Sequence, residues 1–156
     1  MPSKRASITM TPEETAELLA GGRVVLLCTV GPDGLPDPIP MWYSVDEAGA
    51  LVMTTYRSSQ KVVNLRRDPR AVGVVEAGTA YSELRGVQIT GHVQIDEDAA
   101  TVAAAMAEIS GRYGGVAGGA QRGAELDAAR MAQAVKRVRL RLVADRTVSW
   151  DHRKLA

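Results

Sequence analysis

Apolar and polar residues alternate most regularly between positions 84 and 96, a pattern that predicts a strand. The residues on one face of that strand are all apolar: Val87, Ile89, Val93 and Ile95. Those on the other face are polar and uncharged: Gln88, Thr90, His92 and Gln94. Such a face is either solvated or lies against a polar ligand.

Shorter runs rich in β-branched and aliphatic residues predict five further strands, at residues 24–30, 36–45, 50–55, 70–76 and 137–142. The turn residues 31–34 and 46–49 join the first three of these strands into a meander. Within the second, Pro36, Pro38 and Pro40 remove every other backbone N–H along one side. That strand must therefore lie at a sheet edge or beside something other than a pairing strand.

Four helices are predicted, at residues 12–21, 60–67, 96–112 and 124–135. The first begins at a capping box in which Thr11 precedes Pro12 and Glu14 completes the pair. Residues 111–123 contain six glycines and are expected to form a loop, with a role as a lid over the substrate left open. Six strands joined mostly by short turns favour a mainly β fold with helices, built as a closed antiparallel barrel.

The chain has 156 residues, which fits a single domain over residues 1–156, with residues 1–10 expected to be a flexible N-terminus. A net charge of +1 argues against a general nucleic-acid-binding protein. No apolar run reaches the roughly 18–20 residues that a membrane span needs, and the first eleven residues do not read as a secretory signal. We therefore expect a cytoplasmic protein that associates with neither nucleic acid nor membrane.

Few residues are available for metal or disulfide chemistry. Cys28 is the single cysteine, so an intrachain disulfide and a cysteine-based zinc site are excluded, and it is expected to be a core residue. His92 and His152 are the only histidines, which excludes a multi-histidine metal site. Phenylalanine is absent and there are only two Trp and four Tyr. Aliphatic residues must therefore fill the core, and the few aromatic residues are candidates for functional positions.

The densest chemistry lies between residues 54 and 70. Five cations and one carboxylate within residues 57–70 give this segment a local charge of +4. Hydroxyl groups stand where the predicted strand ends and the helix begins: Thr54, Thr55, Ser58 and Ser59. A helix N-terminus favours binding of an anion. Arg57 adds a planar guanidinium group, and Lys61 adds a localised positive charge one turn later. The pattern indicates either a phosphate site or a solvated basic helix with a serine cap.

These residues resemble a known family. Thr-Thr-x-Arg-Ser-x-x-Lys at 54–61, followed by Asn-Leu-Arg-Arg-Asp-Pro-Arg at 64–70, is similar to the flavin-reductase split barrels related to pyridoxamine 5′-phosphate oxidase. The resemblance extends to residues 30–34, 40–43 and 87–96, and residues 149–154 resemble a C-terminal signature of one branch of small proteins. It thus covers nearly the whole chain from Val24 to Lys154.

The resemblance implies a six-stranded Greek-key split barrel and a homodimer with its active sites at the interface. It also implies a set of cofactor-binding residues. Thr54 and Thr55 would lie beside the cofactor, Arg57, Ser59 and Lys61 at its phosphate and ribityl region, and Asn64 just beyond. The strand against the ring system would comprise Ile39, Pro40, Met41 and Trp42, and Trp150 would form part of the active-site wall.

Members of this family use FMN or the deazaflavin coenzyme F420, and a few take haem. Two features favour F420 here. Its phosphate, lactyl carboxylate and glutamate tail call for the surplus of cations at residues 57–70, although Arg66 and Arg67 also fit a solvent-facing helix end. The Arg and Ala usage also suggests a GC-rich genome, where the deazaflavin is common. FMN is the alternative cofactor.

The function predicted from this resemblance is hydride transfer from reduced F420 to an electron-poor C=C or C=N bond of a small molecule. Tyr43, Tyr56 or bound water would supply the proton. The alternatives are an FMN-dependent oxidase or reductase, and a non-catalytic protein that binds the cofactor. The chain lacks the C-terminal Arg-x-His motif of pyridoxamine phosphate oxidases proper, so oxidation of vitamin B6 is not expected. The face formed by Arg137, Arg139 and Arg141 either pairs with carboxylates across the dimer or is solvated.

Overall fold

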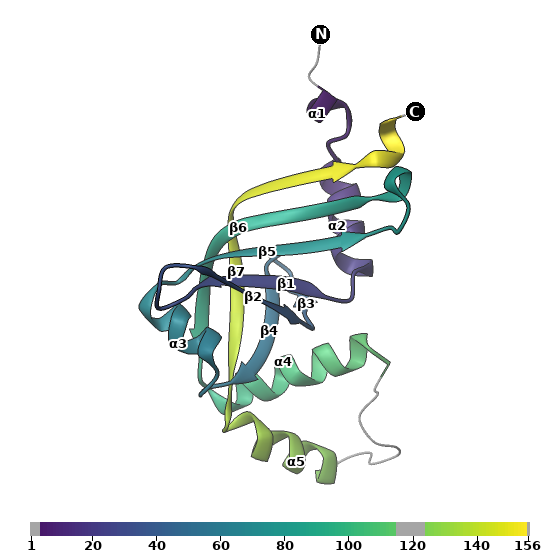
Figure 1. Cartoon of the computed structure of the whole chain (residues 1–156). Helices are drawn as coiled ribbons and strands as arrows, with labels where there is room; N and C mark the ends of the chain where they lie inside the picture. Colours follow the sequence, from purple (N-terminus) through teal and green to yellow (C-terminus); the bar gives the residue numbers. More distant parts are fainter. Residues whose placement is uncertain (1–3, 115–123, 156) are drawn as a thin grey trace.

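The structure, a computed structural model, describes residues 4–114 and 124–155. Figure 1 shows a strongly curved sheet with helices around it. The strands are β1 (Val25–Val30), β2 (Pro36–Met41), β3 (Ser44–Val45), β4 (Leu51–Tyr56), β5 (Arg70–Ala77), β6 (Arg85–Asp96) and β7 (Arg137–Asp151). The α-helices are α1 (Lys4–Ser7), α2 (Pro12–Gly21), α3 (Gln60–Arg67), α4 (Ala99–Arg112) and α5 (Ala124–Ala134), and two short 3₁₀ helices span Tyr81–Glu83 and His152–Leu155.

All neighbouring strands in this sheet are antiparallel, in the order β2-β1-β5-β6-β7-β4-β3. The predicted mainly β class is confirmed, whereas the prediction of six strands is wrong because the described part of the chain forms seven. The predicted strand at 36–45 is split at Trp42 and Tyr43 into β2 and β3. The Tyr43 N–H bonds to the hydroxyl of Tyr113 at 3.1 Å instead of to a neighbouring strand.

This split explains why the sheet is a half-barrel. β2 and β3 lie at opposite edges of the sheet, yet only Trp42 and Tyr43 separate them in sequence. The sheet must therefore curl until its two edges approach each other. Among the described strands, β2 is paired only with β1, so the barrel predicted from the pattern as closed stays open along one side. We call this opening, between β2 and β3–β4, the seam.

The proline-rich segment forms an edge strand, as predicted. β2 pairs with β1 along its whole length, with Pro36, Pro38 and Pro40 opposite Val30, Cys28 and Leu26. Because that pairing is intact, the missing N–H groups of the prolines must point to the open side of β2.

The core lies on the concave face of the sheet and is aliphatic. Its largest fully buried side chains include Leu27, Leu51, Met53, Leu140 and Leu142. The apolar face of β6 is buried as predicted, with Val87, Ile89 and Val93 at most 4% exposed. α4 covers β4 and β7 and packs against α5, while α2 packs on β5 and β6 (Figure 1).

β7 runs to Asp151, nine residues beyond the predicted end at Leu142. The alternation of buried and exposed positions that predicts a strand is lost in this part of β7, where residues 144–147 are all exposed. The strand continues because β6 offers pairing partners as far as Arg85, past a register shift at Thr90 and Gly91. At Gly91 a Cβ atom would lie 1.8 Å from the carbonyl oxygen of Val143, so only glycine fits this irregularity.

The N-terminal segment contacts the end of β7. The Asp151 N–H donates to the carbonyl oxygen of Ile8 at 2.7 Å, and the Met10 N–H donates to Ser149 Oγ at 3.1 Å. α2 then begins at the predicted capping box, with both Thr11–Glu14 hydrogen bonds present. No helix in the described ranges is long and apolar enough to cross a membrane.

Candidate functional site

Three of the predicted site residues meet where β4 ends and α3 begins. Ser59 is the N-cap residue of α3, but its hydroxyl makes no capping hydrogen bond. It lies instead 3.4 Å from Thr55 Oγ1, which also accepts a hydrogen bond from Lys61 Nζ at 3.3 Å. An ammonium group, two hydroxyls and the N-terminus of α3 thus converge, the combination that binds an anion.

Lys61 lies at the seam. Its hydrogen-bond partner Thr55 is on β4, beyond the part of β4 that β3 covers, while the carboxylate of Asp37 acts on it from β2. Burial lowers the pKa of Lys61 below its ordinary value of 10.5, and the negative charge of Asp37 partly opposes that change. Asp37 was not among the residues expected in the site, since its position on a proline-rich strand gave no sign that it faces α3.

Asn64 is fully buried and holds α3 in place. Its side-chain NH₂ donates to Thr29 Oγ1 and to Asp37 Oδ2, both at 3.0 Å. Its oxygen accepts from Gln60 Nε2 at 2.9 Å. These bonds connect α3 to β1 and β2, so the geometry gives Asn64 a positioning role. Its role as a cofactor-binding residue just beyond the phosphate and ribityl region stays a prediction.

The remaining cations of this segment differ in how they are paired. Arg66 donates to Glu97 Oε1 at 2.6 Å, and Arg67 donates to the carbonyl oxygen of Val30 at 2.5 Å. Arg57 makes only a longer ion pair with Glu97, at 3.7 Å, and its guanidinium donates no hydrogen bond within the described residues. Arg57 therefore keeps guanidinium donors available at the connection between β4 and α3.

The end of β2 carries a stacked aromatic pair. The ring of Trp42 lies 4.5 Å from that of Tyr113, at the end of α4, with an angle of 6° between the planes. Trp42 is 53% exposed, whereas Tyr113 is buried and held by hydrogen bonds to the backbone of Tyr43 and Arg23. The orientation of the exposed indole is therefore fixed. Sequence reasoning missed Tyr113, although its rarity as an aromatic residue was an available signal.

On β2 itself, Pro40 is exposed on the outer side, while Ile39 and Met41 are half-buried on the inner side with Asp37. Thr54 is half-buried on β4, opposite Arg139 of β7. Thr54 thus points to the other face of the sheet from Thr55.

The two candidate proton donors have different surroundings. Tyr43 is fully buried, its hydroxyl donates to the carbonyl oxygen of Leu19 at 2.6 Å, and burial raises its pKa to about 12. This geometry gives Tyr43 a structural role. Tyr56 is 49% exposed, and the Arg137 guanidinium lies 4.2 Å from the centre of its ring.

Trp150 lies far from the other predicted site residues within one chain. It stands near the end of β7, opposite Gly86, and packs so closely that a Cβ at Gly86 would lie 2.2 Å from the indole. It lines a cavity of about 370 Å³ with Arg5, Ile8, Ser149 and His152. Thr54 and Thr55 pair with the opposite end of β7, so the monomer does not bring Trp150 to Lys61.

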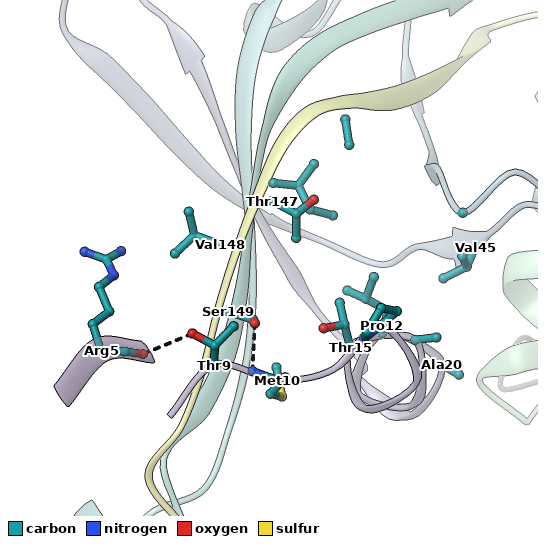
Figure 2. Close-up of a pocket in the computed structure, with 15 residues that line it drawn as sticks. Arg5, Thr9, Met10, Pro12, Thr15, Ala20, Val45, Thr147, Val148 and Ser149 are labelled. Carbon is teal, nitrogen blue, oxygen red and sulfur yellow. Dashed lines mark hydrogen bonds between the residues drawn. The ribbon is translucent and has the colours of Figure 1, made fainter. Parts of the chain in front are cut away.

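A larger cavity, of about 640 Å³, lies between α2 and β7. Figure 2 shows Pro12 and Thr15 of α2 facing Thr147 and Ser149 of β7 across it. None of the eleven predicted cofactor-binding residues lines this cavity. The proposed lid at 111–123 lies mostly outside the described residues, which resume at Ala124.

Comparison with known proteins identifies the family. Residues 11–143 match the family described as pyridoxamine 5′-phosphate oxidase, and the fold is the half-barrel described above. The chain belongs to this family. A search of the curated proteins found no match.

Solved structures agree with this assignment. A conserved hypothetical protein from Mycobacterium tuberculosis is 39% identical, with a TM-score of 0.85, over 99% of this chain and 92% of that one. A protein described as an F420 reductase is 24% identical, with a TM-score of 0.68, over 88% and 98%. An FAD-binding protein from Mesorhizobium loti is 19% identical, with a TM-score of 0.66, over 90% and 94%. The last two likenesses show a common fold.

Proposed function

We propose that this protein is an oxidoreductase that uses a flavin-type cofactor, preferentially the deazaflavin F420, and transfers a hydride to an electron-poor C=C or C=N bond of a small molecule. The observation that carries the proposal is the group formed by Lys61, Thr55 and Ser59 at the N-terminus of α3, with Arg57 in the connection between β4 and α3. Membership of a family that includes oxidoreductases adds support.

The donor set fits the phosphate of such a cofactor. Lys61 would bind it as a point charge, and the hydroxyl of Ser59 and the first N–H groups of α3 would donate to its oxygens. The planar guanidinium of Arg57 would also donate to the phosphate, because it donates no hydrogen bond to any described residue.

β2 would then align the rest of the cofactor. Asp37 marks the phosphate end and Trp42 the other end, a separation of about 16 Å at ~3.3 Å per residue. That span suits a ribityl chain followed by a tricyclic ring. The flat, exposed indole of Trp42, oriented by Tyr113, offers a surface against which a planar ring can stack.

When bound, the reduced deazaflavin supplies a hydride and reacts poorly with oxygen, and the protein supplies position and a proton. Among the candidate donors, Tyr56 is the exposed one, with the Arg137 guanidinium 4.2 Å from the centre of its ring. Tyr56 or bound water would deliver the proton to the substrate.

We further propose that the working unit is a homodimer with the active site at its interface. Trp150 is distant from Lys61 in one chain, so it could contribute only to the site of a second copy. The outer face of the sheet carries exposed apolar residues suited to such contact, including Val24 and Leu26 of the β1 region and Pro38 and Pro40 of β2.

The test is to identify the ligand that co-purifies with the protein, by native mass and visible absorption, and then to assay the reduced-cofactor form against a panel of unsaturated substrates. The proposal expects the mass and spectrum of F420 and turnover of at least one substrate. FMN with oxygen consumption would support the FMN-dependent alternative. Tight F420 binding with no turnover would support a cofactor-binding protein, and absence of any flavin affinity would refute the proposal.

A further inference from the structure

The cavity of about 640 Å³ between α2 and β7 has no part in the function proposed above. Its walls come from α2, from the N-terminal segment before α2, from the turn between β3 and β4, and from β6 and β7. Sites for small molecules commonly measure about 300–1,000 Å³. The cavity therefore has the size of a ligand site, and none of the predicted cofactor-binding residues lines it.

Hydrogen bonds hold one wall of this cavity in place. The Met10 N–H donates to Ser149 Oγ at 3.1 Å, so the segment before α2 is fixed against β7. Lys154 Nζ, which follows β7, donates to the carbonyl oxygen of Thr9 at 3.0 Å. Because the N-terminal segment is fastened at both points, the cavity is a defined feature of the fold.

Most of the cavity lining is apolar. The larger side chains in it include Leu19 of α2, Val45 of β3 and Ile89 of β6. α2 also contributes the small side chains of Ala16 and Ala20, and these leave room between the helix and β7. A ligand that fills this space must carry an apolar body, because burial of apolar surface is the main contribution that such walls can make to binding.

Two hydrogen-bond donors without acceptors line the cavity. Arg5 is the only charged residue among the described residues of the lining, and its guanidinium forms no ion pair or hydrogen bond with any of them. Ser149 is 9% exposed, and its hydroxyl accepts from Met10 but donates to no described residue. Arg5 and Ser149 also line the smaller cavity of about 370 Å³, so both stand where the two cavities meet. Figure 2 shows Arg5 and Val45 at opposite ends of the larger cavity.

We propose that this cavity binds a small hydrophobic carboxylic acid, with its carboxylate at Arg5 and Ser149 and its apolar body between α2 and β7. A carboxylate accepts hydrogen bonds from a guanidinium and from a hydroxyl at once, and a buried hydroxyl proton without an acceptor is costly. No carboxylate among the described lining residues repels such an anion. The ligand is separate from the cofactor, so the proposal does not rest on the proposed function.

The experiment measures binding of decanoate and of uncharged 1-decanol by calorimetry. The wild-type protein should bind decanoate about three- to tenfold more tightly than 1-decanol, the share of an exposed charge-assisted contact. Arg5→Gln should remove this preference, whereas Arg146→Gln, an exposed arginine of β7 outside the lining, should retain it. Ala16→Phe fills the cavity and should abolish binding of both probes, whereas Ala129→Phe, at an exposed position of α5, should not.

Melting temperatures show whether the variants are folded, and Arg5→Gln, at an exposed residue, still tests the site if Ala16→Phe does not fold. The proposal is wrong if the wild-type protein shows no saturable binding of decanoate, or if either control variant acts like its partner.

Two further results would also overturn it. Displacement of F420 by decanoate would assign the cavity to the cofactor site, and a changed oligomeric state of Ala16→Phe in sedimentation would assign it to a contact between two copies. Failure of the wild-type protein to bind F420 would count against the proposed function alone, because the decanoate titration does not need the cofactor.

Discussion

At the scale of single residues, the candidate site depends on the pair formed by Lys61 and Asp37 across the seam. Burial favours the neutral form of the lysine, and the nearby carboxylate favours the charged form that an anion needs. The same carboxylate repels any phosphate that approaches. Asp37 therefore has two opposing effects, on the charge of Lys61 and on the affinity of the site.

The variant Asp37→Asn separates these effects, because asparagine can still accept the hydrogen bond from Asn64. While Lys61 is protonated, loss of the repelling charge should tighten binding of inorganic phosphate by roughly two- to fivefold. Removing the negative charge also lowers the pKa of Lys61 further. Phosphate binding should therefore be lost at a lower pH in the variant than in the wild-type protein as pH rises.

Titration of phosphate affinity against pH measures both effects, with Glu47→Gln, an exposed carboxylate on the 46–49 turn, as control. A variant that binds phosphate more weakly on the acidic side of the titration, where Lys61 is charged, or that loses phosphate at a higher pH, would contradict this account.

At the scale of elements, α3 is positioned by a buried polar contact. Asn64 satisfies its amide on β1 and β2, and this places Lys61 one turn earlier against Thr55. The sequence predicted the helix at 60–67 with its bounds, because the serine cap and Asp68-Pro69 mark both ends. It did not reveal the role of Asn64, because the partners Thr29 and Asp37 are distant in sequence.

Asn64→Ala should lower the free energy of unfolding by about 1–3 kcal/mol, since Asp37 and Thr29 lose a buried partner. Chemical denaturation measures this loss, and Val63→Ala, exposed on the same helix, is the control. If Asn64→Ala weakens cofactor binding but leaves stability unchanged, Asn64 is a direct cofactor ligand, as the resemblance implied.

Gly91→Ala should be more damaging, because the added methyl group would collide with the carbonyl oxygen of Val143 and disrupt the β6–β7 ladder. We expect a loss of at least ~3 kcal/mol of stability. Gly21→Ala, where a Cβ meets nothing within 4 Å, should be neutral or stabilising. Equal thermal unfolding of the two variants would show that β6 does not need glycine at its register shift.

At the scale of the whole molecule, local pattern predicted the elements better than their junctions. The β6 face, the α2 capping box and the edge position of β2 follow from spacing and from proline and are all present. The break at Trp42 and Tyr43 was missed because it is made by Tyr113, seventy residues away. The full length of β7 was missed because pairing with β6, not its own alternation, sustains it.

The same scale decides whether two copies build one site. If Lys61 of one copy works with Trp150 of the other, Lys61→Ala and Trp150→Ala should each bind cofactor poorly as homodimers. Mixing the two under exchanging conditions should restore about a quarter of the wild-type sites, the statistical share in a symmetric dimer.

Sedimentation of the mixture must show a dimer at micromolar concentration. A monomer that binds cofactor tightly, or a mixture without recovery, would show that the active site is not shared between chains.

The central claim is that Lys61, Thr55 and Ser59 bind the phosphate of a flavin-type cofactor. The most direct measurement is a fluorescence titration of F420 and FMN into the wild-type protein, Lys61→Ala and the distant control Arg130→Ala. Loss of one charge-assisted contact predicts affinity about ten- to a hundredfold weaker for Lys61→Ala, with the melting temperature and the control unchanged. Equal affinity of Lys61→Ala and the wild-type protein for both cofactors would contradict the account.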